Sequence, residues 1–442
     1  MKTRSKQASR RAFLKITSGA GCGLLLRGLA TGLPPAWILN PSTAWAQDAR
    51  DFQTLILSNS GRGDPVNINC PGSVKLDSNK NRFANNPHLN FPMFTLNGQR
   101  VRGAAPWAEL PNDLRRRLAF IHLKTFAAAH PEHRETMTLR GAVRTAAGNG
   151  TEMLASMVAQ ETAGGIQTVQ LEPIVLGRDS VTFNGQPLQK ASPADLKALF
   201  QGDPNDLNRL RTLRDQTIDR IYRDLRQNGT ASQRTFLDRF ARSASEARQL
   251  GNELGDWVNQ PVRDPDNPNS ADEQVVAAVA LAKARVAPVI TVNIPFGGDN
   301  HQDVDLQNEA ASTTSGAATI GLLWESLKAA RIHNRVTFAM LNVFGREFQR
   351  NGAGGRNHNR HHGVMVIFGQ KIKGGVYGGV TENGRCMNIN PNSGRGIANG
   401  GIKADQTMVS AGKTLCTAIG IPARTLNARI QGGRIVRAAL RS

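Results

Sequence analysis

The chain has 442 residues and carries 55 Lys and Arg against 34 Asp and Glu, a formal net charge of +21. This length is enough to bury a large hydrophobic core. The charge fits either an ordinary soluble surface, the favoured interpretation, or anionic partners such as phosphorylated or sulfated molecules, anionic glycans or membrane surfaces. Only two tyrosines and no basic-aromatic recognition motif accompany the charge, so the composition disfavours nucleic acid as a partner.

The first 46 residues have the organisation of an export signal. Arg10 and Arg11 lie in the sequence Ser-Arg-Arg-Ala-Phe-Leu-Lys, the pattern of substrates of the twin-arginine (Tat) pathway. A moderately apolar stretch follows at 16–33, and an Ala-Trp-Ala sequence predicts cleavage between Ala46 and Gln47. We therefore expect the Tat translocase to export the folded chain, which makes the mature protein periplasmic or secreted. Glycines and an arginine make 16–33 a poor spanning helix, so no permanent membrane span is expected in the mature chain.

The remainder of the chain predicts an α/β fold. In chain order, apolar strands are expected at 52–57, 118–123, 166–176, 288–294, 336–343 and 364–368. Helices are expected at 153–160, from Ser192-Pro193 onward, over much of 206–258, and at 271–285, 310–330 and 406–419. Helices that alternate with unbroken apolar strands are typical of a mainly parallel sheet covered on both faces. We expect a three-layer α/β/α sandwich formed by one domain over 47–442, with a helical insertion at about 192–260 and an irregular segment at 75–117.

Three cysteines remain after removal of the signal: Cys70, Cys386 and Cys416. An oxidising compartment allows one disulfide and one remaining thiol, with Cys386–Cys416 as one pairing, but the sequence does not fix the partners.

Candidate ligands gather where predicted strands end. In open parallel sheets, ligands bind beyond the carboxyl ends of the strands. Asp64 follows the first strand, Asp299 and His301 follow the strand at 288–294, and His358 precedes the strand at 364–368. Carboxylates and imidazoles at one edge favour a divalent cation such as Zn²⁺, Mn²⁺, Fe²⁺ or Ca²⁺, and a simple surface loop is the alternative.

Two arginines follow in the same region. Arg346 and Arg356 are candidates for binding an anion beside such a cation, because a guanidinium group can hold a phosphate or sulfate with two hydrogen bonds.

Four segments resemble motifs of the exported bacterial family catalogued as domain of unknown function 1501. Residues 297–301, 344–346, 354–358 and 372–378 resemble, in order, the family's G-W-D-T-H, E-F-G-R-T, G-G-R-D-H and K-G-G-x-x-x-G motifs. That family is similar to the alkaline phosphatase and sulfatase superfamily. The resemblance implies an alkaline phosphatase-like domain whose metal ligands are Asp64, Asp299, His301 and His358.

The resemblance leaves the catalytic residue unknown and is incomplete at two positions. The superfamily uses a Ser or Thr nucleophile, and Thr136, Thr138 and Thr151 lie in the corresponding stretch, where each also fits an ordinary turn or cap. Asn357 and Val343 stand where the family usually has Asp and Glu, which weakens a site for two metals. The candidates to replace the lost ligands are Asp303, Glu347, His361 and His362.

Two functions therefore remain open. The first is a metal-dependent hydrolase of phosphate or sulfate esters. The alternative is a catalytically silent periplasmic protein that binds an anion, a glycan or a protein partner on the same scaffold.

Overall fold

The computed structural model describes residues 52–73, 86–166, 168, 170–201, 220, 227 and 254–441. The predicted signal, with Arg10, Arg11, Ala46 and Gln47, lies outside these residues, as does most of the predicted helical insertion. By its internal contacts the chain divides into two compact units. One unit consists of Asp48–Pro187 and Asn269–Ser442, and the other contains Leu188–Pro268 together with Met1–Gln47.

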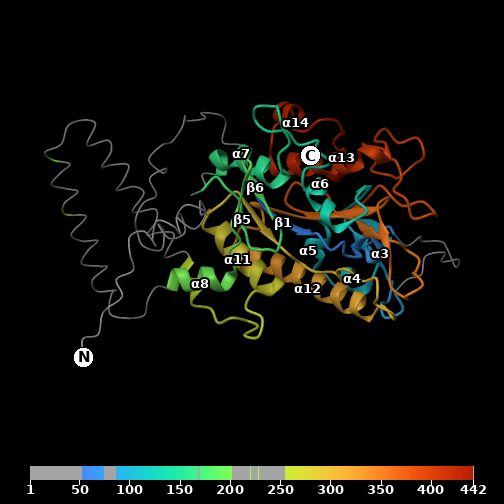
Figure 1. The fold of residues 1–442 in the computed structure, drawn as a ribbon, viewed down its shortest axis with the longest axis horizontal. Helices are drawn as coiled ribbons and strands as arrows, with labels where there is room; N and C mark the ends of the chain where they lie inside the picture. Colours follow the sequence, from blue (N-terminus) through green and yellow to red (C-terminus); the bar gives the residue numbers. More distant parts are fainter. Residues whose placement is uncertain are drawn as a thin grey trace. The chain divides into compact units, whose positions relative to one another are not determined.

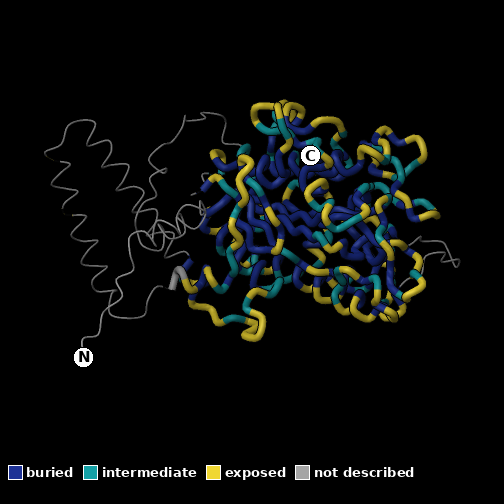
Figure 2. The backbone as a smooth tube through the Cα atoms, in the orientation of Figure 1, coloured by how far each residue is buried: buried dark blue, intermediate teal, exposed yellow. Residues whose placement is uncertain are grey.

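The larger unit is built on a seven-stranded sheet with the order β13-β4-β12-β9-β1-β8-β5. The strands are β1 (Thr54–Ser60), β4 (Leu118–Leu123), β5 (Ile174–Val175), β8 (Val289–Val292), β9 (Val336–Asn342), β12 (Gly363–Phe368) and β13 (Gly375–Tyr377). Every residue of β1, β4, β9 and β12 is buried, so these strands form the centre of the core (Figure 2). Such near-continuous apolar runs are typical of strands that are covered on both faces.

The sheet is mainly parallel, as expected, with one exception. Strand β12 is antiparallel to both of its neighbours, β4 and β9, whereas the pairs β1–β9, β1–β8, β5–β8 and β13–β4 are parallel. Gly363, which begins β12, pairs with Leu123, which ends β4. The beginning of β12 therefore lies at the edge of the sheet where the parallel strands end.

Helices cover both sides of this sheet (Figure 1). Helices α7 (Leu154–Ile166), α13 (Thr407–Ile419) and α14 (Ala423–Arg429) lie on one side, and α4 (Ala105–Ala108), α11 (Ala271–Lys283) and α12 (Gln307–Ala329) lie on the other. The shorter helical elements are α3 (Val66–Asn69), α5 (Asn112–Arg115), α6 (His133–Met137), η1 (His130–Glu132), η2 (Ala404–Gln406) and η3 (Arg437–Ala439). This arrangement is an α/β architecture with a large mixed sheet.

Local sequence signals account for the ends of the long helices. Ser270 Oγ accepts a hydrogen bond from Glu273 N at 3.3 Å and so caps α11. Asp303 caps α12, because its two carboxylate oxygens accept from Asn308 N at 3.2 Å and Glu309 N at 2.9 Å. Helix α13 ends at Gly420, whose φ of 108° is unfavourable for residues with a side chain.

Two predicted segments are corrected. The segment 166–176 was expected to form strands, but Ile166 ends α7 and only Ile174–Val175 pairs with β8. The stretch at 75–117 is not wholly irregular, since β2 (Met93–Leu96) and β3 (Gln99–Arg102) form a hairpin. Asn97 and Gly98 connect them with φ values of 44° and 86°, the positive values that an Asn-Gly hairpin turn requires. The remaining two-stranded sheets pair β6 (Thr182–Phe183) with β7 (Gln186–Pro187) and β10 (Gly345–Arg346) with β11 (His358–Asn359).

The smaller unit contains the helix predicted at Ser192. Helix α8 (Pro193–Gln201) begins after Ser192, whose hydroxyl accepts from Asp195 N at 3.0 Å and donates to Asp195 Oδ2 at 2.6 Å. Lys197 Nζ donates to Gln260 O at 3.1 Å. These contacts confirm the predicted helix start at this point of the chain.

The disulfide that an oxidising compartment would allow between Cys386 and Cys416 is not formed in the structure. Cys70, Cys386 and Cys416 are all free and buried. Cys386 Sγ lies against Met387 O and Thr407 Oγ1 instead of a second sulfur. Burial raises the pKa of the Cys386 thiol to about 12, so it stays protonated at neutral pH. Separately, the described residues include no helix with the length and apolar character needed to cross a bilayer.

Candidate metal site

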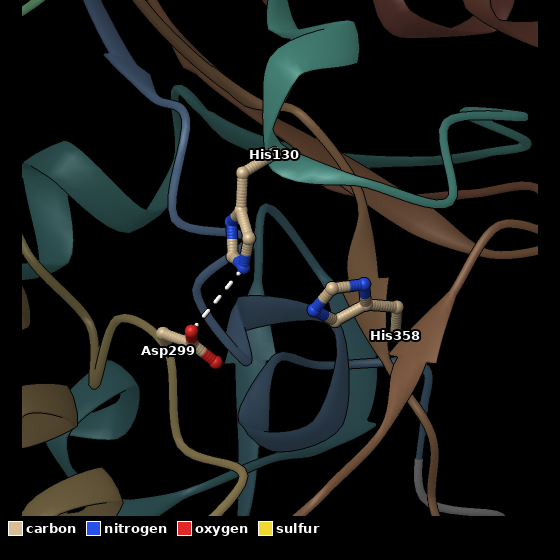
Figure 3. A group of neighbouring side chains, drawn as sticks. All are labelled: His130, Asp299 and His358. Carbon is tan, nitrogen blue, oxygen red and sulfur yellow. Dashed lines mark ion pairs between the residues drawn. The ribbon is translucent and has the colours of Figure 1, made fainter.

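Three side chains from distant parts of the sequence converge at the carboxyl edge of the sheet. His130 belongs to η1, after β4; Asp299 lies in the loop after β8; and His358 belongs to β11, just before β12 (Figure 3). One potential ligand atom from each residue lies within 4.8 Å of those of the other two. Because β12 is antiparallel, the segment that leads into it reaches the same edge as the segments that leave β4 and β8.

Backbone carbonyls determine which nitrogen of each imidazole faces the cluster. His130 Nδ1 lies 2.8 Å from Gly61 O, and His358 Nδ1 lies 2.6 Å from Ala128 O. A carbonyl oxygen only accepts, so each Nδ1 carries a proton and each neutral ring offers an Nε2 lone pair. Metal-binding histidines are commonly oriented by a second hydrogen bond of this kind.

Asp299 supplies the negative charge of the cluster. Its Oδ2 lies 3.2 Å from His130 Nε2, the contact drawn in Figure 3, and its Oδ1 lies 3.1 Å from Arg346 Nη2. Partial burial raises the pKa of Asp299, but the charges of Arg346 and His130 outweigh burial and lower it overall. With Nδ1 of His130 donating to Gly61 O, the lone pair of a neutral His130 ring faces Asp299 Oδ2, an arrangement that a cation between the two atoms would stabilise.

His301 lies beside the three residues and is hydrogen-bonded to one of them. Its Nε2 is 2.8 Å from His358 Nε2 and 3.6 Å from Asp299 Oδ1. Since His358 Nε2 is the acceptor in this pair, His301 Nε2 is the donor. Burial lowers the pKa of His358, which favours its neutral, ligand-competent form. A cation bound by His358 would have to replace this hydrogen bond.

Asp64 braces the loop that carries Asp299 and is not one of the three clustered residues. Its Oδ1 accepts hydrogen bonds from Phe296 N at 3.1 Å and Gly298 N at 2.8 Å. Its Oδ2 is buried and makes no hydrogen bond to the part of the chain that the structure describes. Asp64 thus positions the loop that carries Asp299, and its role as a ligand stays a prediction.

Arg346, a predicted anion-binding residue, contacts other groups of the protein through its guanidinium group. Its side chain is fully buried, and its guanidinium group donates to Gly63 O at 2.6 Å, Arg62 O at 2.7 Å and Arg356 O at 3.2 Å, besides Asp299. These acceptors hold together the loops after β1, β8 and β9. Arg346 orients Asp299 by donating a hydrogen bond to its carboxylate, and its own side chain is buried away from solvent.

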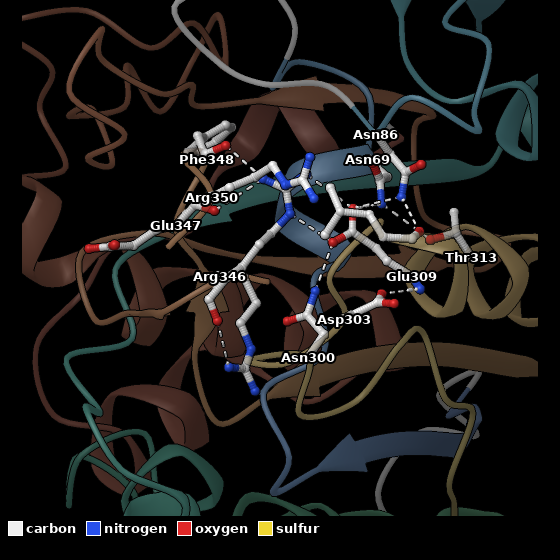
Figure 4. Close-up of polar contacts among 12 residues, drawn as sticks. Asn69, Asn86, Asn300, Asp303, Glu309, Thr313, Arg346, Glu347, Phe348 and Arg350 are labelled. Atoms are coloured by element: carbon white, nitrogen blue, oxygen red, sulfur yellow. Dashed lines mark hydrogen bonds and ion pairs between the residues drawn. The ribbon is translucent and has the colours of Figure 1, made fainter. Parts of the chain in front are cut away.

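Arg356 is the second predicted anion-binding residue that the structure places in the interior. Its Nε donates to Glu309 Oε2 at 2.7 Å and its Nη1 to Phe348 O at 2.6 Å. Both side chains of the Arg356–Glu309 ion pair are fully buried. Figure 4 shows that Glu309 lies among amide side chains, and it accepts hydrogen bonds from Asn69, Asn86 and Asn300. The charge of Arg356 is thus neutralised by the protein itself.

The two positions that depart from the family pattern are not among the three clustered residues. Val343 is fully buried against Ala127 and Phe344. Asn357 is exposed and donates to Glu347 Oε2 at 3.4 Å. Of the residues considered as replacements, Asp303 caps α12 and Glu347 contacts Asn357, so neither adds a ligand. His361 is partly exposed and likewise is not one of the three clustered residues.

His362 belongs to a separate buried pair. Its Nε2 lies 2.8 Å from His122 Nδ1, whereas His122 Nε2 contacts Pro71 O at 3.1 Å and His362 Nδ1 contacts Asn67 Nδ2 at 3.2 Å. Pro71 O can only accept and Asn67 Nδ2 donates. Each ring therefore needs only one proton, on its Nε2, to satisfy every hydrogen bond from Asn67 to Pro71. Burial lowers the pKa of His122 to about 4 and that of His362 well below its usual value.

The three threonines considered as nucleophiles make ordinary structural contacts. Thr136 Oγ1 donates to Val343 O, and Thr138 Oγ1 donates to Glu135 O while accepting from Gly141 N. Thr151 pairs with Arg144 in an isolated bridge. The nucleophile therefore remains unassigned.

Fold and site together define an α/β protein with a His/Asp cluster that could hold a metal at the carboxyl edge of its sheet. The family model described as "Protein of unknown function (DUF1501)" matches residues 180–396, which supports the family expected from the motifs. The match includes Asp299, His301 and His358 but not Asp64 or His130. A comparison with curated proteins finds no match.

His130 is the clustered residue that the sequence analysis did not select. It lies seven residues after the end of β4, in a segment that also contains His133. The sequence signal that could have identified His130 is its position after the strand predicted at 118–123. It was not decisive, because the positions of β4, β8 and β12 within one sheet depend on the strand order and are not visible along the chain.

Proposed function

We propose that this protein is an exported metal-dependent hydrolase that acts on phosphate or sulfate esters. The observation that supports it best is the convergence of His130, Asp299 and His358 at the carboxyl edge of a mainly parallel sheet. Two of these side chains are already oriented by backbone carbonyls and the third by Arg346. The similarity to the alkaline phosphatase and sulfatase superfamily, inferred from the motifs, points to the same chemistry.

Each residue has a defined part in this proposal. His130 and His358 provide neutral nitrogens, Asp299 provides an oxygen and a negative charge, and Arg346 holds that carboxylate in place. A divalent cation at this position would act as a Lewis acid toward the ester oxygen and lower the pKa of water. A set of two nitrogens and one oxygen favours Zn²⁺, Mn²⁺ or Fe²⁺ over Ca²⁺, which prefers oxygen ligands alone.

We propose that the hydrolase acts in the periplasm or outside the cell. The Arg10-Arg11 motif, the apolar stretch and the cleavage site before Gln47 support export by the Tat translocase to the periplasm or beyond.

The experiment measures metal content and binding in the mature chain. Zn²⁺ and Mn²⁺ are titrated into chelator-treated wild type and into the variants His130→Ala, Asp299→Asn and His358→Ala. The control is His88→Ala, because His88 is an exposed histidine of the same unit whose ring contacts Asp305 O. We expect near-stoichiometric binding by the wild type and the control, and affinity lowered by at least about tenfold in each cluster variant. Equal binding by all variants would disprove the site.

Turnover distinguishes the hydrolase from the silent binding protein. Metal-loaded wild type is expected to hydrolyse aryl phosphates or aryl sulfates, and the cluster variants are expected to lose this activity. Metal binding without turnover of either ester class would favour the silent binding protein. That alternative is consistent with Val343 and Asn357, which add no ligand near the cluster.

A further inference from the structure

A cavity with a volume of about 430 Å³ adjoins the clustered residues and shares His130 with them. Its walls come from four segments that follow strands of the sheet, namely those after β1, β4, β5 and β8. Ligands of open α/β sheets bind at this edge, and the volume is within the range of small-molecule sites. The position and size of the cavity therefore suit a small molecule that also reaches the cluster.

The residues that line the cavity carry mostly positive charge. Three arginines line the cavity: Arg62, Arg134 and Arg178. Its one acidic residue, Asp179, is buried with Oδ1 3.6 Å from His133 Nδ1. The arginines are exposed at the cavity, whereas Arg346 and Arg356 are buried beneath the cluster. Exposed guanidinium groups in a concave site attract and hold anions.

Arg62 connects the cavity with the cluster. A Cβ atom added at Gly298 would lie 3.5 Å from Arg62 Cδ, so the aliphatic part of Arg62 lies against the loop that carries Asp299. The backbone of Arg62 is fixed from both sides, since its N–H donates to Ser60 Oγ at 3.1 Å and its carbonyl accepts from Arg346 Nη2 at 2.7 Å. Arg62 thus lies both in the cavity wall and against the loop that supplies Asp299 to the cluster.

We propose that the cavity binds the organic part of the substrate through a second anionic group, a carboxylate or phosphate, while the ester group lies at His130. This inference rests on the proposed function and adds the class of substrate: a small ester whose organic part is itself anionic. Ser60, Ser180 and Thr182 provide hydroxyl groups in the same lining, which suits a polar molecule better than an apolar one.

The test measures binding without turnover. Binding of 4-carboxyphenyl phosphate and of phenyl phosphate to the mature chain is measured by calorimetry in the presence of a chelator. We expect the carboxylated compound to bind about tenfold more tightly, the gain typical of one charge-assisted hydrogen bond. In Arg134→Gln and Arg178→Gln this preference is expected to disappear. Arg424→Gln, which replaces an exposed arginine on α14 outside the cavity, is the matched control and is expected to retain the preference.

Two results would overturn the inference: equal affinity for the two compounds in the wild type, or the same loss in the control as in the cavity variants. Failure of the proposed hydrolase would have a different signature. The preference and its dependence on Arg134 and Arg178 would persist, but the metal-loaded protein would hydrolyse neither compound.

Discussion

Glu309 is the residue at which the polar interactions beneath the cluster meet. It is fully buried on α12 and pairs with Arg356, which in turn donates to the carbonyl of Phe348. Three asparagine side chains also donate to its carboxylate: Asn69, Asn86 and Asn300. Buried charges are tolerated only when they are paired and hydrogen-bonded, and here both conditions are met.

Replacement of Glu309 by glutamine tests this dependence. Glu309→Gln keeps the size of the side chain but leaves the charge of Arg356 buried without its counterion. We expect the free energy of unfolding, measured by urea denaturation, to fall by about 3–5 kcal/mol. Glu325→Gln is the matched control on the same helix, because Glu325 and its partner Lys328 are both exposed to solvent. A small, equal effect of the two substitutions would show that Arg356 is stabilised by other groups.

At the scale of elements, the direction of β12 decides what reaches the functional edge. Because β12 is antiparallel to β4 and β9, the segment before it delivers His358 to the cluster, and His362 lies next to His122 of β4. The same strand therefore supports two histidine groups with different environments. One lies at the cluster, partly open to solvent, and the other is a buried pair with satisfied hydrogen bonds.

The buried pair predicts that the fold becomes less stable in mild acid. His122 stays neutral in the folded protein until about pH 4, whereas in the unfolded chain it takes up a proton near pH 6.5. The unfolded state therefore binds more protons over this range. Stability should be full above pH 6.5 and should fall toward pH 4, by up to about 1.4 kcal/mol per pH unit for each such histidine.

Denaturation at several pH values checks this prediction. His122→Gln and His362→Gln are expected to show a shallower decline than the wild type between pH 6.5 and pH 4. His88→Gln, an exposed histidine, is expected to retain the wild-type slope. If the slope were the same in all four proteins, the histidine pair would not be responsible for the acid sensitivity.

At the scale of the whole molecule, the proposed export route requires that folding precede transport. The chain carries a net charge of +21, and seven of its basic residues lie in the first 46 positions, where no acidic residue is present. That distribution, with the twin arginines, is typical of an export signal and not of a folded surface.

Replacement of the twin arginines tests the route. The double variant Arg10→Lys, Arg11→Lys is expected to remain in the cytoplasm at full length, because the Tat signal is read through its arginines. The wild type and the control Arg4→Lys are expected in the exported fraction, shortened to begin at Gln47. Fractionation followed by N-terminal sequencing distinguishes these outcomes, and export of the double variant would refute the proposed route.

Much of the fold could be predicted because its signals are local. Unbroken apolar runs predicted β4 at 118–123 without error and placed β1, β8, β9 and β12 to within a few residues, since a strand covered on both faces has no need of polar positions. Ser192 likewise marked the start of α8. The strand expected at 166–176 was too long, since only β5 forms there, and the hairpin of β2 and β3 was missed, because pairing partners determine these short strands more than their own composition does.

The sequence alone determined the family resemblance, the prediction of an export signal and the selection of Asp299 and His358. Tertiary structure decided the rest of the site. It brought in His130, assigned Asp64 to a bracing role and buried Arg346 and Arg356, because strand order, strand direction and burial are relations between distant segments. Local patterns reveal which side chains are able to bind a cation, but only the packing of the sheet determines which of them meet.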